Sequence, residues 1–207
     1  MNNAGITKDN IVLRMTEDEW MDVLNVNLNA AFKISKIVLK FMLKKRWGRI
    51  INITSTSAST GNKGQANYAA AKLGIVGLSK SMALDMGRFR VRSNCIAPFA
   101  WSRLIGTIPT NTEEEKARVS KIQQMTPDKI APLAVALCSD AAQDVSGQIF
   151  GVRNNEIFLF NHTRPIRFAH MAEGWTPDTV LDRVIPAFKA DFFPLERSGD
   201  VFSWDPM

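Results

Sequence analysis

Residues 49–72 read RIINITSTSASTGNKGQANYAAAK, and this stretch decides the fold. It opens with the β-branched run Arg49 to Thr54, which is typical of a buried strand. Small polar residues and glycines over residues 55–64 indicate a loop, and from Ala66 to Met86 the pattern becomes helical. A strand, a loop and a long helix in succession predict one unit of a parallel sheet that helices cover.

The segment before this strand predicts a long helical region from Glu17 to Lys45. Thr16, followed three residues later by Glu19, has the spacing of a capping box. Apolar residues keep the helical period as far as Lys45, although Asn25 and Asn27 interrupt the stripe.

The segment after the long helix continues the alternation of strands and helices. The elements expected there are a strand over residues 90–96 that ends at Ala97-Pro98, a long loop with short helical pieces over 99–126, a helix over 127–138, and strands over 148–152 and 156–160 around an Asn154-Asn155 turn. This order predicts the α/β class, a doubly wound parallel sheet with helices on both faces.

The chain divides into residues 1–160 and a proline-rich extension over residues 161–207 that is expected to pack on the domain or on a partner subunit. One helix is expected in the extension, with Thr176 as N-cap and a proline at the first helical position, ending at Phe188. Both histidines lie here, and they are interpreted as surface or packing residues rather than metal ligands.

Composition excludes several classes of protein. The chain has 207 residues, of which 45% are hydrophobic, and no apolar run approaches the ~20 residues of a membrane-spanning helix. The net charge of +6 comes from scattered basic residues, the densest group being Lys44 to Arg46 at a helix end, so nucleic-acid binding is not expected. Cys95 and Cys138 are expected to be buried free thiols in a reducing cytosol, which indicates a cytoplasmic location.

The residues that carry chemistry are Ser55, Tyr68 and Lys72. Tyr68 is the only tyrosine, and Lys72 follows four residues later on the same helix face. A cation about 5 Å from the phenol would lower its pKa by about two units and make it a general acid-base at neutral pH. By itself, such a pair is more often a partly buried tyrosine beside a solvated lysine.

Other motifs accompany the pair in a fixed order. They are Asn2-Asn3-Ala4-Gly5, Asn27, Ser55, Tyr68-Ala-Ala-Ala-Lys72 and Asn94-Cys-Ile-Ala-Pro98. Over residues 2–160 the chain therefore resembles the short-chain dehydrogenase/reductase family, and residues 61–68 look especially like 3-oxoacyl-thioester reductases and 3-hydroxyacyl-CoA dehydrogenases. The resemblance implies a Rossmann-like sheet, a cytoplasmic homo-oligomer (a dimer or tetramer) and a small alcohol, ketone or acyl-thioester substrate.

The resemblance also implies roles for individual residues. Tyr68 would be the general acid-base, Lys72 would lower its pKa and hold the nicotinamide ribose of NAD or NADP, Ser55 would position the substrate oxygen, and Asn27 would hold a water in a proton relay to Lys72. The other residues expected to bind the cofactor are Asn3, Ala4, Gly5, Pro98 and Ser102.

Two departures from the family pattern stand out. Phe99 follows Pro98 where the family usually has glycine, and the glycine-rich turn Thr-Gly-xxx-Gly-x-Gly that holds the cofactor pyrophosphate is not in the sequence. The three strand-helix units and the strand expected before Asn3 would occupy roughly 80 to 100 residues. The chain is therefore interpreted as an N-terminally truncated oxidoreductase, or alternatively as a non-catalytic remnant that acts through subunit association of its long helices.

We expect the 207-residue chain by itself to bind NAD or NADP weakly or not at all, because the pyrophosphate-binding turn is missing from it. Calorimetric titration of this chain with each dinucleotide tests the expectation. Micromolar binding would contradict it.

Overall fold

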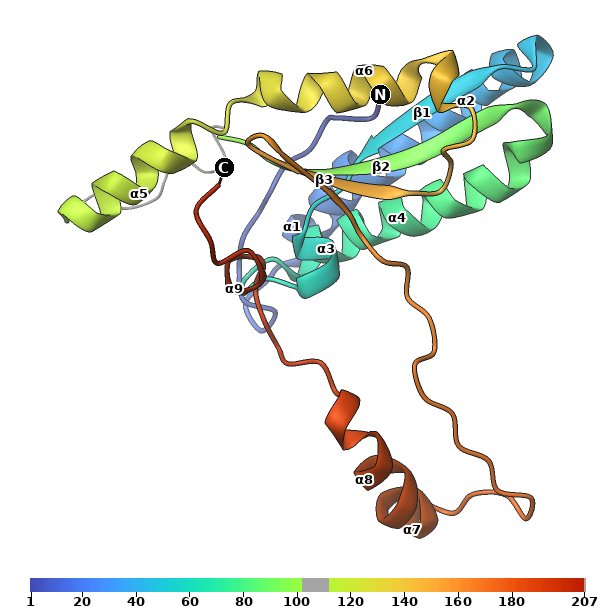
Figure 1. Cartoon of the computed structure of the whole chain (residues 1–207), viewed down its shortest axis with the longest axis vertical. Coiled ribbons are helices and arrows are strands. Elements are labelled where there is room, and N and C mark those ends of the chain that lie inside the picture. Colours follow the sequence, from blue (N-terminus) through green and yellow to red (C-terminus); the bar gives the residue numbers. More distant parts are fainter. Residues whose placement is uncertain (102–111, 207) are drawn as a thin grey trace. The chain divides into compact units, whose positions relative to one another are not determined.

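A four-stranded mixed sheet forms the centre of the computed structural model, which describes residues 1–101 and 112–206 (Figure 1). The strands lie in the order β1-β2-β3-β4, and their bounds are β1 Gly48–Ile53, β2 Val91–Phe99, β3 Ile149–Arg153 and β4 Glu156–Leu159. β1 pairs with β2 and β2 with β3 in parallel, and the β3–β4 hairpin adds an antiparallel edge. The expected parallel sheet is thus confirmed, with one antiparallel strand added.

Helices cover both faces of this sheet. On one face, Ala31 and Ile75 from two helices pack with Cys95 and Ile149 from the strands. On the other face, Ile96 and the neighbouring strand residues pack against Leu137. Cys95 and Ile96 point to opposite faces because successive strand residues alternate. The α/β class with helices on both faces is therefore confirmed.

The first helical region is continuous but not uniform. It comprises α1 (Glu17–Leu24), the π-helical turn η1 (Asn25–Asn29) and α2 (Ala30–Lys45). The predicted capping box forms at its start, where Glu19 N donates to Thr16 Oγ1 at 3.1 Å and Thr16 N donates to the Glu19 carboxylate at 2.8 Å. The asparagines that interrupt the apolar stripe fall in the π-turn, a local widening common at functional sites.

The second long helix, α4 (Ala66–Met86), has the bounds that the sequence predicts. It is preceded by a four-residue helix, α3 (Ser57–Thr60), inside the segment expected to be a loop, and followed by the 3₁₀ turn η2 (Gly87–Phe89). α4 packs against β2, β1 and the first helical region.

The segment after β2 is more regular than expected. An 11-residue helix, α5 (Glu113–Gln123), occupies part of the predicted loop and has its own capping box at Thr112 and Glu115. The 3₁₀ turn η3 (Pro127–Ile130), α6 (Ala131–Cys138) and the 3₁₀ turn η4 (Asp140–Ala142) follow. β2 also runs past Pro98 to Phe99, because the missing N–H of a proline is tolerated at the end of a strand.

The N-terminal residues extend the sheet beyond β1. Asn2 N donates to the Ile51 carbonyl at 2.8 Å, and Ile53 N donates to the Asn2 carbonyl at 3.0 Å. These bonds make a parallel bridge between Asn2 and Asn52. Asn3 to Gly5 therefore leave the sheet at the edge where β1 leads into Ser55.

The chain forms two compact units, one of residues 1–160 and 196–207, the other of residues 161–195. The segment 196–207, which the sequence groups with the extension, thus belongs to the first unit and contains α9 (Ser198–Val201). The second unit holds α7 (Pro177–Thr179), the π-turn η5 (Val180–Val184), α8 (Ile185–Phe188) and the 3₁₀ turn η6 (Lys189–Asp191). As predicted, Thr176 caps this helical region.

The two cysteines differ in environment. Cys95 is buried in β2, as expected, but Cys138 is exposed, because α6 is apolar on all sides and buries only Leu137. None of the helices in residues 1–101 and 112–206 has the length and apolar character that a membrane crossing requires.

We expect Ile96→Ala to lower the free energy of unfolding by ~2–5 kcal/mol, since truncating a buried side chain loses its transfer free energy and leaves a cavity. Ile96 is completely buried, whereas Ile157 on β4 is 61% exposed. Ile157→Ala is the matched control and should change the free energy by less than ~0.5 kcal/mol. Urea denaturation measures both, and similar losses in the two variants would contradict the assigned core.

Candidate functional site

Ser55 and Tyr68 meet at the carboxyl end of β1. Ser55 lies two residues beyond the strand, and Tyr68 lies in the first turn of α4. Their side chains are joined by a hydrogen bond. The structure therefore places a serine hydroxyl and a phenol side by side at the sheet edge where open α/β folds bind their ligands.

Burial raises the pKa of Tyr68 above its usual value near 10. The hydrogen bond with Ser55 lowers this pKa and the negative charge of Asp9 raises it, so the net direction is upward. The spacing of Tyr68 and Lys72 predicted the opposite, a lowered pKa, on the premise that the Lys72 ammonium stabilises the phenolate. Lys72 Nζ instead lies over the face of the Tyr68 ring, 5.5 Å from its centroid.

Lys72 is buried, with 3% of its surface exposed. Its Nζ donates to the Ile53 carbonyl at 2.8 Å, and Thr54 Oγ1 donates to the Lys72 carbonyl at 2.7 Å. Burial lowers the pKa of Lys72 to about 8, because a backbone carbonyl offers a dipole but no negative charge in return for lost water.

Asn27 approaches the same place from the π-turn. Its Nδ2 donates to the carbonyls of Ile6 at 2.8 Å and Val23 at 2.9 Å. Its Oδ1 is buried and accepts no hydrogen bond from the described residues. A buried polar oxygen normally finds a donor, so this atom marks a place for a polar ligand or water.

Gly5 lies between Asn27 and Lys72. A Cβ atom at this position would lie 2.7 Å from Asn27 Oδ1 and 3.5 Å from Lys72 Nζ. The glycine therefore keeps open a space that both polar groups border, and this requirement explains the residue type.

Among the described residues, the others predicted to bind the cofactor make no hydrogen bond with Ser55, Tyr68 or Lys72. Asn3 and Ala4 are exposed on the segment that leads from the Asn2 bridge to Gly5. Pro98 lies at the carboxyl end of β2, on the same sheet edge but one strand further from Gly5. Ser102 lies outside the described residues.

Asn67 is a site-supporting residue that sequence reasoning missed. It is fully buried, its Nδ2 donates to the carbonyls of Lys8 at 3.0 Å and Glu19 at 3.1 Å, and its Oδ1 accepts from Tyr68 N at 2.7 Å. It thereby fixes the start of α4, and so Tyr68, against α1 and the N-terminal segment. An asparagine in the first turn of a helix, directly before the tyrosine, was the available signal.

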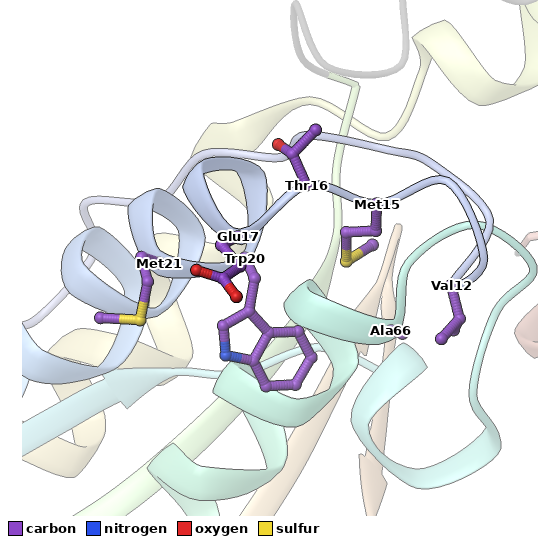
Figure 2. A pocket seen from close by; sticks show the side chains of 7 residues that line it. All are labelled: Val12, Met15, Thr16, Glu17, Trp20, Met21 and Ala66. Carbon is purple, nitrogen blue, oxygen red and sulfur yellow. The ribbon is translucent and has the colours of Figure 1, made fainter.

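One cavity of about 410 Å³ lies between α1 and the first residue of α4 (Figure 2). It is lined by Trp20 and Met21 of α1, by Ala66 of α4 and by residues of the turn before α1. Ser55, Tyr68 and Lys72 are not among the lining residues. In the described part of the chain, no group of three or more His, Cys, Asp or Glu side chains is placed to hold a metal ion.

Comparison with known proteins agrees with this geometry. A protein-family model described as enoyl-(acyl carrier protein) reductase matches residues 1–153. The 3-oxoacyl-[acyl-carrier-protein] reductase of Vibrio cholerae is 41% identical over 158 residues, which cover 73% of this chain and 63% of that protein. The reductase of the same name from Thermotoga maritima is 37% identical over 158 residues, with the same coverage.

Solved structures give the same result. A short-chain dehydrogenase from Mycobacterium avium matches with a TM-score of 0.79 and 31% identity, covering 93% of this chain and 64% of that one. The peroxisomal multifunctional enzyme type 2 of Drosophila melanogaster matches with a TM-score of 0.76 and 25% identity, covering 98% of this chain and 36% of that one. The chain thus spans less than two thirds of the length of these relatives.

We expect the phenol of Tyr68 to titrate above ~10, because burial disfavours the charged phenolate. Ser55→Ala should raise this pKa further by removing the hydrogen bond that favours the phenolate. Since Tyr68 is the only tyrosine, ultraviolet absorbance of the phenolate reports on it alone. Ser59→Ala, at an exposed serine of α3, is the control and should leave the titration unchanged. A midpoint below ~10, or a fall in Ser55→Ala, would show that the assigned environment is wrong.

Proposed function

The chain belongs to the short-chain dehydrogenase/reductase family, and we propose that it serves in hydride transfer between NAD or NADP and a ketone or secondary alcohol. The single observation that carries this proposal is the hydrogen-bonded pair of Ser55 and Tyr68 with the Lys72 ammonium 5.5 Å from the tyrosine ring. In this arrangement a substrate oxygen can meet two hydroxyl donors at once.

The residues around Gly5 fit the nicotinamide ribose of such a cofactor. Lys72 Nζ has three N–H donors and spends one on the Ile53 carbonyl, while Asn27 Oδ1 is a buried acceptor on the other side of the space that Gly5 keeps open. Ribose hydroxyls both donate and accept hydrogen bonds. We therefore propose Lys72 and Tyr68 as ribose-binding residues, with Asn3, Ala4, Gly5, Pro98 and Ser102 as the other cofactor contacts.

The bound nicotinamide would supply or accept the hydride, and the protein would handle the proton. The raised pKa of Tyr68 keeps its phenol protonated at neutral pH, which suits proton donation to the oxygen of a ketone during reduction. Ser55 would donate a second hydrogen bond to the same oxygen as negative charge develops on it. Tyr68 and Ser55 are thus proposed as general acid-base and oxygen-positioning residue.

Lys72 and Asn27 are proposed to return the proton to Tyr68. With a pKa of about 8, Lys72 can exchange a proton near neutral pH. Asn27 Oδ1 borders the same space and is available to orient a water between Lys72 and solvent. The π-turn is what brings the asparagine side chain to this position.

The substrate class is proposed from the relatives. Those from Vibrio cholerae and Thermotoga maritima are named 3-oxoacyl-[acyl-carrier-protein] reductases. A 3-oxoacyl thioester, or the 3-hydroxyacyl thioester in the reverse direction, is therefore the proposed substrate.

Exposed apolar side chains on α2 favour self-association. Ile34, Ile37 and Phe41 are each more than half exposed, and their spacing of three and four residues places them on one face of α2. An exposed apolar stripe of this kind is typical of an interface. We propose a homo-oligomer in which α2 of one subunit packs against α2 of another. We also propose a cytoplasmic location, because Cys95 and Cys138 are free thiols and the cytosol keeps thiols reduced. Association without catalysis is the second candidate function, which the same surface favours.

We expect Tyr68→Phe to lower kcat for reduction of a 3-oxoacyl thioester by about 10²–10⁴-fold, because the variant keeps the ring but loses the transferable proton. The assay follows NADH or NADPH oxidation. The protein is expressed from its gene with any coding sequence that lies upstream of Met1. An unchanged thermal midpoint shows that the variant is folded. Absence of activity in the unmutated protein would favour the association role, and full activity in Tyr68→Phe would remove the tyrosine from the mechanism.

A further inference from the structure

The C-terminal residues 198–205, here called the strap, connect two elements beside the candidate site (Figure 1). At one end, the hydroxyls of Ser198 and Thr60 are 3.0 Å apart, and Thr60 ends the short helix that follows Ser55. At the other end, Asp205 pairs with Lys121 of α5 at 2.6 Å. The strap therefore runs from the Ser55 segment to the helix that follows β2.

A buried ion pair at the β3–β4 turn holds the middle of the strap. Arg153 and Glu156 pair at 3.3 Å, with only 8% and 11% of their side chains exposed. Arg153 also donates to the carbonyls of Phe202 and Trp204, and Trp204 Nε1 donates to the Glu156 carboxylate at 2.7 Å. Arg153 thus donates hydrogen bonds to the strap, and Glu156 accepts one from it.

The strap in turn packs against Phe99 through the ring of Phe202. The rings of Phe99 and Phe202 meet edge to face with centroids 4.8 Å apart, and Phe202 also contacts Phe158 and Trp204. The guanidinium of Arg153 lies 6.0 Å from the Phe99 ring. Phe99 is the residue that stands after Pro98 where glycine is usual, so the strap accommodates the side chain that this departure introduces.

The position of these contacts indicates which part of the site they border. β1, β2 and β3 are parallel, and their carboxyl ends lead to Ser55, Phe99 and Arg153 along one sheet edge. The strap contacts the ends of β2 and β3, and Pro98 lies at the same end of β2, while the segment from Asn3 to Gly5 lies on the opposite side of β1. The strap therefore borders the side of Ser55 that faces away from this segment, which is where a substrate acyl group would lie.

We propose that the strap is a positioning and specificity element for the acyl part of the substrate. Phe202 holds Phe99 and the end of β2, and Ser198 holds the segment that begins at Ser55. The inference rests on the proposed oxidoreductase function for its substrate. The strap lies outside residues 1–153, which the family model matches.

The test combines Phe202→Ala, Phe99→Ala and the double variant, with Phe193→Ala as control because Phe193 is 84% exposed in the other unit. Phe202→Ala should raise KM for a 3-oxoacyl thioester about fivefold or more, and by more than it raises KM for the dinucleotide, because the proposed cofactor contacts Asn3 to Gly5 lie on the far side of β1 from the strap. The double variant should be no worse than Phe202→Ala, because both act through one contact. Phe193→Ala should have no effect.

Hydrogen exchange gives a readout that does not need activity. Phe202→Ala should speed amide exchange in residues 55–62 and leave residues 73–86 of α4 unchanged. Unchanged exchange in residues 55–62, an equal rise in both KM values, or independent effects of the two phenylalanines would overturn the proposal. If the unmutated protein is inactive but Phe202→Ala still speeds exchange there, the oxidoreductase function fails and the positioning role of the strap stands.

Discussion

The buried ammonium of Lys72 is the constraint on which the centre of the molecule depends. An almost fully buried cation is costly, and among the described residues Lys72 Nζ donates only to the uncharged carbonyl of Ile53, the last residue of β1. The reciprocal bond from Thr54 Oγ1 to the Lys72 carbonyl fixes the first turns of α4 to the same strand end. Because these two bonds run in opposite directions between the same elements, helix and strand are locked in register, and Tyr68, one turn earlier, is placed beside Ser55.

The same constraint accounts for the π-turn and the glycine nearby. Asn27 lies in the π-turn, where its Nδ2 donates to the carbonyls of Ile6 and Val23 and its Oδ1 borders the same space as Lys72 Nζ. Gly5 then passes between the two polar groups without a Cβ. The buried lysine, the asparagine of the π-turn and the glycine therefore border one polar space.

Local patterns in the sequence predicted what is locally determined. The helix of Tyr68 and the capping box at Thr16 follow from propensity and periodicity, and they were confirmed. The strand expected over residues 49–54 also forms, with both ends one residue earlier, at Gly48 and Ile53. The exposure of Cys138 and the raised pKa of Tyr68 were not predictable in this way. An apolar helix does not reveal which side is buried, and a spacing of four residues brings an ammonium near a tyrosine ring without bringing it to the phenol oxygen. α5 was expected only as short helical pieces of a loop, although Thr112 and Glu115 carry a capping-box pattern, because its polar sequence shows no apolar stripe.

The environment of Phe99 could not be predicted from local sequence patterns. The sequence identifies it as unusual after Pro98, but its explanation lies about a hundred residues away in Phe202. That contact depends on Arg153, whose burial is tolerated because Glu156 supplies charge and the strap supplies two carbonyls. A buried ion pair adds little net stability compared with apolar packing, but an incomplete one is strongly destabilising. The β3–β4 hairpin therefore requires the strap as much as the strap requires the hairpin, and this mutual dependence ties the far end of the chain to the edge of the sheet where Ser55 lies.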